Sequence, residues 1–120
     1  AGKLTGNAVR VPTPNVSMAI MMLTLASETS KDELNEFLRD IALHSKLQNQ
    51  INYTQSPDAV SSDFVGTREA GIVDSHATIV NGRHCVLYLW YDNEFGYCCQ
   101  VGRMVYKMTG VRYQNYPVDE

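Results

Sequence analysis

Apolar positions along the chain switch between the repeat of a strand and the repeat of a helix. Residues 17–25 form a nearly continuous apolar run, and residues 84–91 form a second run rich in aromatic and β-branched side chains. Runs of this kind are typical of strands covered on both faces. A weak alternation over residues 7–11 predicts a further short strand, which Pro12 and Pro14 end because proline cannot donate to a central ladder.

A helix is predicted over residues 31–44. Ser30 is followed three positions later by Glu33, which is the pattern of a capping box, where each side chain accepts a hydrogen bond from the other residue's backbone N–H. Behind this start, apolar side chains recur at helical spacing and predict one buried stripe: Leu34, Phe37, Leu38 and Ile41.

The second half of the chain predicts a hairpin and another helix. Ser75–Val80 alternates like a strand, and Asn81-Gly82 favours a tight turn before the second apolar run, because both residues tolerate positive φ. A helix over 94–109 is expected to end at Gly110 in a left-handed cap. Its expected buried face holds Tyr97, Cys98, Val101, Val105 and Met108.

The remaining segments are polar and turn-rich. Residues 45–70 predict short extended pieces at most, and the tail over 111–120 is expected to be irregular. Strand and helix periods in one chain indicate an α+β or α/β domain, and 120 residues fit one domain with one core.

Composition excludes several classes of protein. The net charge of −3 comes without a run of Lys or Arg, so the chain lacks the basic patch of a nucleic-acid-binding protein. No apolar run approaches the roughly 18 residues of a membrane span, and the first residues do not resemble a secretory signal. Three cysteines, two of them adjacent, make a poor disulfide framework, so a reducing, cytoplasmic setting is expected. Because the chain begins with Ala1, we expect it to be a piece of a longer protein.

The residues taken alone suggest little catalytic chemistry. The chain has no glycine-rich phosphate loop, and its three histidines are not spaced as metal ligands. His84 and Cys85 are neighbours on a predicted strand, so their side chains are expected on opposite faces. Cys98 and Cys99 are expected to be small buried hydrophobes, although Cys98 lies near a helix start, where a thiolate is stabilised.

Two polar residues each have a structural and a functional interpretation. Arg10, on the first short predicted strand, is either a solvated side chain or a planar fork that binds a phosphate. Asn93, between a strand and a helix, is either a helix N-cap or an amide that recognises another amide. The residues alone favour the structural interpretation of both.

Three segments, in the same order along the chain, resemble the phosphorylating glyceraldehyde-3-phosphate dehydrogenase family. Residues 4–17 read LTGNAVRVPTPNVS, residues 61–64 read SSDF, and residues 90–97 read WYDNEFGY, which is close to a family signature. The resemblance covers the chain up to about Val111. It implies that residues 1–120 are a partial C-terminal catalytic domain of the α+β class, with a mostly antiparallel or mixed sheet and helices on one face.

The resemblance also implies an activity and a set of roles. The family oxidises glyceraldehyde 3-phosphate with inorganic phosphate and NAD to 1,3-bisphosphoglycerate, through a thioester on a cysteine that a histidine activates. Both catalytic residues and the dinucleotide-binding half are expected to precede this segment, so the chain alone is expected to be inactive. By position, Arg10 is expected to bind phosphate, Asn93 to orient the nicotinamide carboxamide, and Tyr97 to lie beside the nicotinamide. NADP is not excluded, because the residue that decides it would belong to the dinucleotide-binding half.

The resemblance also implies how the protein assembles, and two alternative functions stay open. The resemblance implies a homotetramer formed through the open sheet face, and a last helix that packs on the dinucleotide-binding domain. The apolar stripe of the 94–109 helix is therefore expected to be exposed here or buried against another copy. The alternatives are a fragment of the related erythrose-4-phosphate dehydrogenase and a non-catalytic assembly module that keeps the sheet without the nucleophile.

Overall fold

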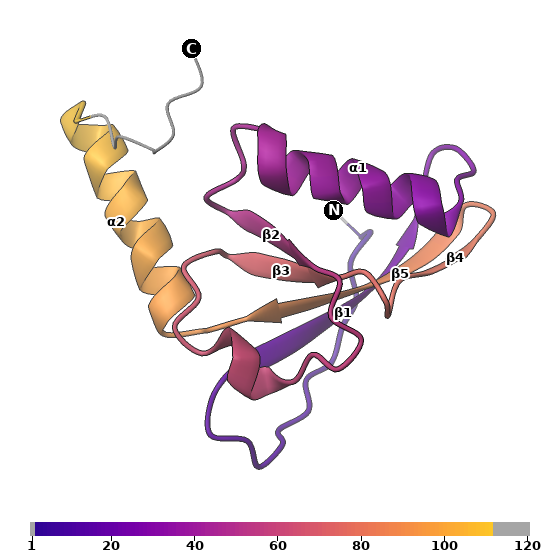
Figure 1. Cartoon of the computed structure of the whole chain (residues 1–120), viewed down its shortest axis with the longest axis horizontal. Helices are drawn as coiled ribbons and strands as arrows, with labels where there is room; N and C mark the ends of the chain where they lie inside the picture. Colours follow the sequence, from indigo (N-terminus) through magenta and orange to yellow (C-terminus); the bar gives the residue numbers. More distant parts are fainter. Residues whose placement is uncertain (1, 112–120) are drawn as a thin grey trace.

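The structure, a computed structural model, describes residues 2–111. The predicted irregular tail therefore lies, apart from Val111, outside the described residues. The elements follow one another along the chain as β1 (Ser17–Thr24), α1 (Lys31–His44), β2 (Ile51–Thr54), the short 3-10 helix η1 (Ser61–Phe64), β3 (Gly71–Asp74), β4 (Ile79–Asn81), β5 (His84–Tyr91) and α2 (Phe95–Thr109) (Figure 1).

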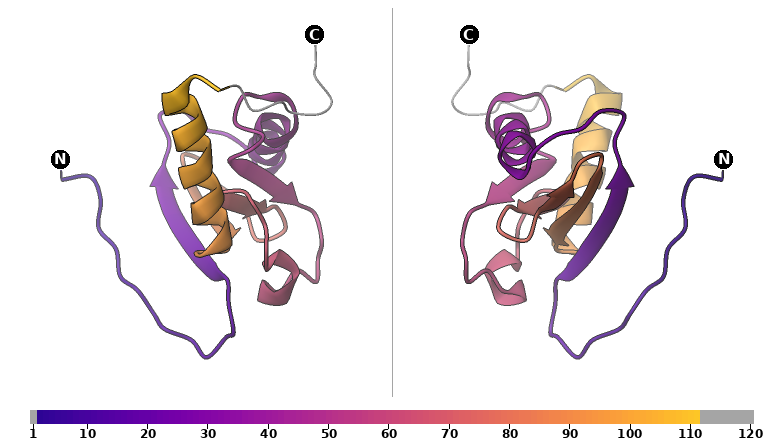
Figure 2. Two further views of the ribbon diagram at one scale, coloured as in Figure 1. Left: turned by 90° about the vertical axis from the view of Figure 1, so that its left-hand side faces the viewer. Right: turned by 90° about the vertical axis from the view of Figure 1, so that its right-hand side faces the viewer.

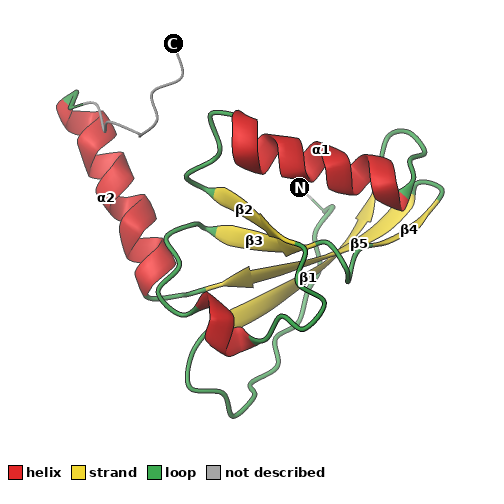
Figure 3. Ribbon diagram, viewed as in Figure 1, coloured by secondary structure: helices red, strands yellow, loops and turns green. Residues whose placement is uncertain are grey.

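The sheet is built around β5. This strand pairs antiparallel with β1 along its whole length, and also antiparallel with β3 near its end and with β4 near its start. β2 then pairs parallel with β3, which gives the order β1-β5-β3-β2 with β4 beside β5 (Figure 3). This mostly antiparallel, mixed sheet with two helices confirms the predicted α+β class.

The apolar run at 17–25 forms β1, as predicted, and cover of its open face by a neighbouring subunit stays a prediction. The side chains of Ile20 and Met22 are 54% and 82% exposed, and they share a face because they are two residues apart. The neighbouring strand β5 is better covered, since Cys85 and Leu87 are 2% and 7% exposed. The edge strand β1 therefore presents an open apolar surface.

Strand β3 was not predicted from the sequence. All four of its residues are buried, and Val73 is 1% exposed. Gly71 allows close packing here, because a Cβ at this position would lie 3.3 Å from Leu89 Cδ2. Parallel pairing of β2 with β3 requires a long crossover, which residues 55–70 supply with η1 in their middle.

The predicted strand Ser75–Val80 is wrong in its first half. Ser75 to Ala77 form a turn, and only Ile79–Asn81 is strand. The turn forms because its polar groups find partners within the protein: Ser75 Oγ donates to Thr54 O at 2.8 Å, and Thr78 Oγ1 donates to Asp74 O at 3.4 Å. Alternation in this segment reflects satisfied buried polar groups and not a pleated strand.

The hairpin between β4 and β5 confirms the predicted turn but shifts it by one residue. Asn81 pairs with His84, so the two loop residues are Gly82 and Arg83. Gly82 has φ of +58°, and positive φ at the first loop residue is what a type II′ turn demands of glycine.

Helix α1 begins as predicted. Ser30 Oγ accepts from the Glu33 N–H at 3.2 Å, and Glu33 Oε2 accepts from the Ser30 N–H at 3.0 Å. Glu33 Oε2 also accepts from the Thr29 hydroxyl at 3.2 Å. The bonds from the Ser30 N–H and, next, from the Thr29 hydroxyl hold the pKa of Glu33 below its ordinary value. The capping box therefore fixes the start of the helix.

The face that α1 turns to the sheet differs in part from the predicted stripe. Leu34, Leu38 and Ile41 are half-buried as predicted, but Phe37 is 60% exposed. Ala42 is buried instead, because the helix lies against β2 on the side of the 34–38–41–42 positions (Figure 1). At the start of the helix, Asn35 Nδ2 donates to Ser75 O at 3.0 Å and ties α1 to the end of β3.

A small core joins η1 to the sheet. Phe64 stacks on Trp90 with ring centroids 5.3 Å apart and planes inclined by 23°. Val16 and Ile72 pack into the same cluster. Residues 61–64 therefore serve to place Phe64 over the end of β5.

The predicted strand over residues 7–11 is not formed. Residues 2–15 are coil, and Val9 is 82% exposed. A strand needs a neighbour for its backbone N–H and C=O groups, and no described strand lies beside this segment, which runs out away from the sheet (Figure 2). Among the described residues, no helix has the length and apolar character to cross a membrane.

Candidate functional site

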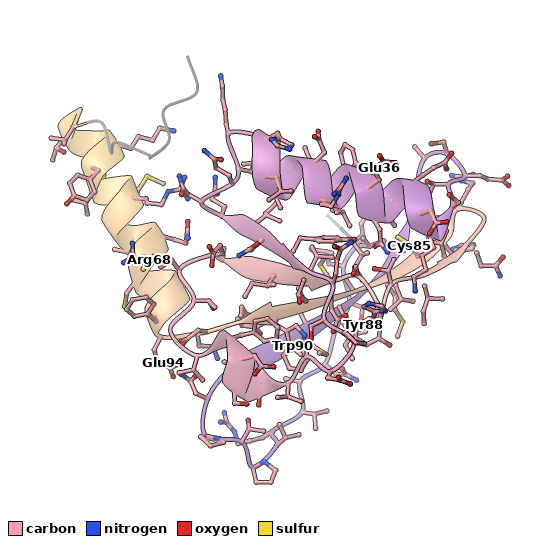
Figure 4. The ribbon with its side chains drawn as sticks, viewed as in Figure 1. Glu36, Arg68, Cys85, Tyr88, Trp90 and Glu94 are labelled. Carbon is pink, nitrogen blue, oxygen red and sulfur yellow. The ribbon has the colours of Figure 1, made fainter. Side chains whose placement is uncertain are left out.

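Two of the predicted site residues, Asn93 and Tyr97, lie where β5 ends and α2 begins. Figure 4 labels Trp90 in β5 and Glu94 at the base of α2, on either side of this junction. Pairing of Ser17 with Tyr91 brings the start of β1 to the same place. The junction therefore joins parts of the chain that are more than 70 residues apart in sequence.

Asp92 holds the junction together. It is 3% exposed. Its Oδ1 accepts from the N–H groups of Glu94 and Phe95 at 3.0 and 2.9 Å, and its Oδ2 accepts from the Gly66 N–H at 2.9 Å and from Asn15 Nδ2 at 3.2 Å. The Gly66 and Phe95 N–H groups are the main causes that hold the pKa of Asp92 below its ordinary value of 3.8, against the effect of burial. One carboxylate thus ties the start of α2 to the loop after η1 and to the approach to β1.

Asn93 does not cap α2, because the Asp92 carboxylate binds the first N–H groups of the helix. Instead, Asn93 Nδ2 donates to Ser17 Oγ at 2.9 Å. The Asn93 side chain is exposed, and its Oδ1 accepts no hydrogen bond from a described residue. The amide is therefore held at one end and open at the other, an arrangement that fits recognition of another amide.

Val16 is strained between these contacts. It is the one described non-glycine residue with positive φ, at +73°. Such a backbone costs on the order of 1–3 kcal/mol for a non-glycine residue and clusters near functional sites. Burial of its side chain against Phe64 and the bond from its N–H to Asn15 Oδ1 at 2.7 Å offset that cost. With this backbone at Val16, Asn15 reaches Asp92 and Ser17 reaches Asn93.

The structure does not bring all the predicted site residues together. Arg10 lies in the exposed coil before β1, and its guanidinium makes no hydrogen bond to a described residue. Tyr97 lies one turn beyond Asn93 in α2 and is 69% exposed. Asn93 lies just before α2 and Tyr97 in its first turn, whereas no hydrogen bond within the described chain joins Arg10 to either.

Polar groups attach α2 to the rest of the domain. Gly96 is buried, and a Cβ on it would lie 2.6 Å from Glu69 O. One turn on, Gln100 Nε2 donates to Arg68 O at 2.9 Å and to Asn49 O at 3.2 Å. Arg68, labelled in Figure 4, belongs to the loop beside the helix. The face of α2 that contacts the domain therefore lies close to the backbone of residues 68–69 and is held there by polar contacts.

The predicted apolar face of α2 has no cover within the described chain. Its apolar side chains are exposed by 45–80%: Tyr97, Val101, Val105 and Met108. Cys98 is exposed as well. The stripe was expected to be exposed here or buried against another copy. It is exposed within the described chain, and burial against another copy stays a prediction. The predicted left-handed cap at Gly110 is present with φ of +74°.

The cysteines and histidines form no reactive cluster within the described residues. Cys85 is buried, Cys99 is half-buried, and no group of three His, Cys, Asp or Glu residues in positions 2–111 could hold a metal ion. His84 is exposed and contacts Thr24 Oγ1 through Nδ1 at 3.2 Å, on the opposite face from Cys85, as predicted.

The family follows from comparison with known sequences. The sequence model described as "Glyceraldehyde 3-phosphate dehydrogenase, C-terminal domain" matches residues 1–93. The chain belongs to the glyceraldehyde-3-phosphate dehydrogenase family. The predicted resemblance is thereby confirmed, and the matched range includes the strained turn at Val16 and ends at Asn93.

Similar proteins are named as glyceraldehyde-3-phosphate dehydrogenases or as proteins like them. The chain is 59% identical over 116 residues to a glyceraldehyde-3-phosphate dehydrogenase-like protein of Pseudomonas aeruginosa, which covers 97% of this chain and 25% of that protein. It is 40% identical over 112 residues to the cytosolic glyceraldehyde-3-phosphate dehydrogenase of Craterostigma plantagineum, covering 92% and 33%. It is 41% identical over 111 residues to the enzyme of Schistosoma mansoni, covering 92% and 32%. The chain thus spans between a quarter and a third of the length of these dehydrogenases.

Sequence reasoning missed the two residues that organise the junction between β5 and α2, Asp92 and Ser17. A signal for Asp92 was present, because an aspartate just before a helix is a strong capping residue. For Ser17 there was no local signal, since its contact to Asn93 spans 76 positions.

Proposed function

We propose that the chain forms the C-terminal part of the catalytic domain of a cytoplasmic, NAD-dependent glyceraldehyde-3-phosphate dehydrogenase. The whole enzyme would oxidise glyceraldehyde 3-phosphate with inorganic phosphate to 1,3-bisphosphoglycerate. The observation that carries the proposal is the Asn93 amide, held by Ser17 at the exposed end of β5 inside the segment that resembles the family signature. Membership of the dehydrogenase family and the names of the relatives support it.

Three residues of this chain take part in the proposed reaction. The Asn93 amide fits the nicotinamide carboxamide, because one amide can pair donor and acceptor with another. Tyr97 lies one turn away, where its exposed ring would flank the nicotinamide. Arg10 would bind the phosphate of substrate or the attacking phosphate, because a guanidinium offers paired N–H donors to phosphate oxygens. NAD would supply the acceptor for the hydride, and NADP stays within the proposal.

The nucleophile of the reaction is not assigned to this chain. Cys85 is closed off at 2% exposure. Cys98 is exposed, but neither it nor Cys99 makes a hydrogen bond with a described histidine that could activate a thiol. We therefore expect residues 1–120 alone to be inactive.

A homotetramer is the proposed assembly, and a non-catalytic assembly module is the second candidate function. One observation favours an assembly role: the open face of β1 and the stripe of α2 expose Ile20, Met22 and Met108 at 54%, 82% and 80%. Apolar surface of this extent is typical of contact sites. An intact product without dehydrogenase activity that still forms defined oligomers would favour the module.

The test is a spectrophotometric assay of NADH formation by the intact gene product. Glyceraldehyde 3-phosphate is supplied with and without inorganic phosphate, with NADP in parallel, and erythrose 4-phosphate without phosphate probes the related activity. We expect rapid NADH formation only with glyceraldehyde 3-phosphate and phosphate together. Faster turnover of erythrose 4-phosphate without phosphate would assign the chain to that enzyme instead, and no NADH from either substrate would overturn the dehydrogenase proposal.

Two variants assign the roles separately. Arg10→Ala is expected to raise the KM for phosphate or for the phosphorylated substrate by about tenfold or more, because a charge-assisted bond is lost, with little effect on the KM for NAD. Asn93→Ala is expected to raise the KM for NAD and to leave the KM for phosphate unchanged. Arg39→Ala, on the exposed side of α1, and the exposed Asn52→Ala are the matched controls. Equal effects of Arg10→Ala and Asn93→Ala on both constants would contradict these assignments.

A further inference from the structure

A groove lies between the first half of α1 and the ends of β2 and β3. Its volume is about 350 Å³, and its walls come from the helix, from the end of β2 and from the turn that follows β3. Because β2 and β3 are parallel, both strands end at the same edge of the sheet, beneath α1 (Figure 1). Crevices at the carboxyl ends of parallel strands are common ligand sites. We propose that this groove binds a primary ammonium group, carried by a small amine or by a lysine side chain.

The groove is held in shape by side chains that bond backbone carbonyls. Lys31 Nζ donates to His76 O at 2.9 Å, and Asn35 Nδ2 donates to Ser75 O at 3.0 Å. His76 Nε2 contacts Gln55 O at 3.0 Å. These bonds tie α1 to the turn after β3, and that turn to the end of β2, so the groove exists before a ligand enters it.

A backbone carbonyl only accepts hydrogen bonds, so these contacts settle the orientation of two side chains. The NH2 end of Asn35 must face Ser75 O, which leaves Oδ1 as the other end of the amide. Nε2 of His76 must carry the hydrogen that Gln55 O accepts, so Nδ1 of the neutral ring is an acceptor. The free ends of both side chains are therefore acceptors, and a ligand that bonds either of them must bring an N–H or O–H donor.

Asn35 Oδ1 is the clearest sign of a missing donor. It is closed to solvent, yet it accepts no hydrogen bond from a described residue. A buried acceptor without a partner is costly, and a ligand that supplies a donor removes that cost. The groove wall includes the long, exposed side chain of Arg39, and side-chain shifts on binding are common. A ligand can therefore reach Oδ1 although surface water does not.

The charged side chains of the groove favour a cationic donor over a neutral one. The carboxylates of Asp32 and Glu36, the latter labelled in Figure 4, line the middle of the α1 wall. Lys31, already bound to a carbonyl, and Arg39, about two helical turns further on, line its ends. The half-buried ring of Tyr53 also lines the groove, and aromatic rings attract cations. An ammonium group supplies three N–H donors and a positive charge together, so it matches both the acceptors and the carboxylates.

The experiment measures the binding of three probes to the intact gene product by ligand-observed NMR titration. Butylammonium carries the charge and the N–H donors, butyltrimethylammonium carries the charge alone, and 1-butanol carries a donor without the charge. We expect butylammonium to bind at least about tenfold more tightly than the other two, because it alone forms charge-assisted hydrogen bonds. No turnover is measured, so a failure of the proposed dehydrogenase reaction leaves this result unaffected.

A fourth probe distinguishes the two sources of the ammonium group. Nα-acetyl-lysinamide represents a lysine side chain of another protein, and butylammonium represents a free amine. Both are expected to bind, and the tighter of the two names the source.

Two substitutions locate the site. Asn35→Ala removes the acceptor without a partner and is expected to weaken butylammonium binding by about fivefold or more. Glu36→Gln removes one carboxylate and is expected to weaken binding by about two- to fivefold. Because Glu36 is exposed and its side chain bonds no described residue, this second variant should fold normally. Asp40→Asn, on the same helix but outside the groove, is the matched control and should leave binding unchanged.

Three results would overturn the inference. Equal binding of butylammonium and butyltrimethylammonium would mean that the cation is attracted by surface charge alone. No saturable binding of butylammonium would mean that the groove holds no ammonium site. Binding that Glu36→Gln and a folded Asn35→Ala both leave unchanged would place the site elsewhere on the protein.

Discussion

Helices α1 and α2 have similar lengths and similar apolar patterns, but they are attached to the domain in opposite ways. Helix α1 buries Ala42 and half-buries Leu34, Leu38 and Ile41 against the sheet. Helix α2 turns its polar side inward and leaves its apolar stripe exposed. A helical apolar stripe therefore shows that a face will be covered by some partner. It does not show that the partner lies in the same chain.

The attachments also differ in kind. Helix α1 gains from apolar area removed from water, which tolerates small shifts. Helix α2 depends on a close approach at Gly96 and on side-chain bonds from Gln100 to the carbonyls of Arg68 and Asn49. Such contacts have demanding geometry, so they fix an orientation while contributing little buried apolar surface.

The largest expected difference is between matched truncations in the two helices. In the 120-residue chain, Leu38→Ala should lower the free energy of unfolding by about 2–3 kcal/mol, because a methyl-rich side chain leaves the α1–sheet interface. Val105→Ala in α2 should change it by less than about 0.5 kcal/mol, since this side chain is 53% exposed. Urea unfolding followed by far-UV circular dichroism measures both, and equal losses would mean that α2 buries its stripe in solution.

A pair of glycines in α2 tests the close approach. Gly96→Ala should destabilise the chain by about 1–3 kcal/mol, because its Cβ would lie 2.6 Å from the backbone oxygen of Glu69. Gly102→Ala meets nothing within 4 Å and should instead stabilise the helix by about 0.5–1 kcal/mol. Thermal unfolding of the two variants gives the comparison, and a stabilising Gly96→Ala would show that α2 is not packed on residue 69.

Acid should weaken the base of α2 through Asp92. Its pKa is lowered in the folded state, so its ionised form adds stability at pH values above its ordinary 3.8, and this stability is lost as the pH falls through the folded-state pKa. Asp92→Asn should lower the melting temperature at pH 7 by about 5–10 °C, because an amide NH2 would face the N–H donors of Gly66 or of Glu94 and Phe95. Melting curves from pH 7 to pH 3 should show that the difference in melting temperature between the unsubstituted chain and Asp92→Asn becomes smaller in acid. A difference in melting temperature that does not change with pH, or that equals the difference for the exposed control Asp58→Asn, would argue against stabilisation of α2 by the Asp92 carboxylate.

The smallest expected effect is at the start of α1. Ser30→Ala should cost about 1 kcal/mol, because the Glu33 N–H loses its acceptor and the capping box is opened. Ser27→Ala, three residues earlier and outside the helix, should be neutral within about 0.5 kcal/mol. Denaturant unfolding of the two variants is the measurement, and equal effects would show that the cap contributes nothing measurable.

The predictable parts of the fold are those with local causes. The capping box at Ser30 and Glu33, the left-handed cap at Gly110 and the turn at Gly82 each depend on a few neighbouring residues, and all three form. Strand β3 could not be predicted in the same way. Its four residues carry no alternation, and its strand state depends on pairing with β2 and β5. For residues 7–11 the error is the reverse. Their alternation predicts a strand, but they are coil because no described strand lies beside them to pair with.

The same division applies to the site. Asn93 and Tyr97 were found because they belong to a compact motif, and Arg10 was found in another. Their chemical roles remain predictions for the assays above. Asp92 and Ser17 organise the junction through contacts to Asn15 and Asn93, which lie about 75 positions away along the chain. Spacing within a motif cannot disclose partners at that distance.

The sequence by itself determined the family, the α+β class, the start of α1 and the end of α2, because each depends on residue identity or on local hydrogen bonding. Tertiary structure decided which apolar faces are covered, since burial depends on what lies opposite a helix or strand. It also decided that Asp92 caps α2 while Asn93 turns to Ser17. Both residues can cap a helix, and only the approach of residues 15–17 and of Gly66 assigns the carboxylate to the buried position and the amide to the exposed one.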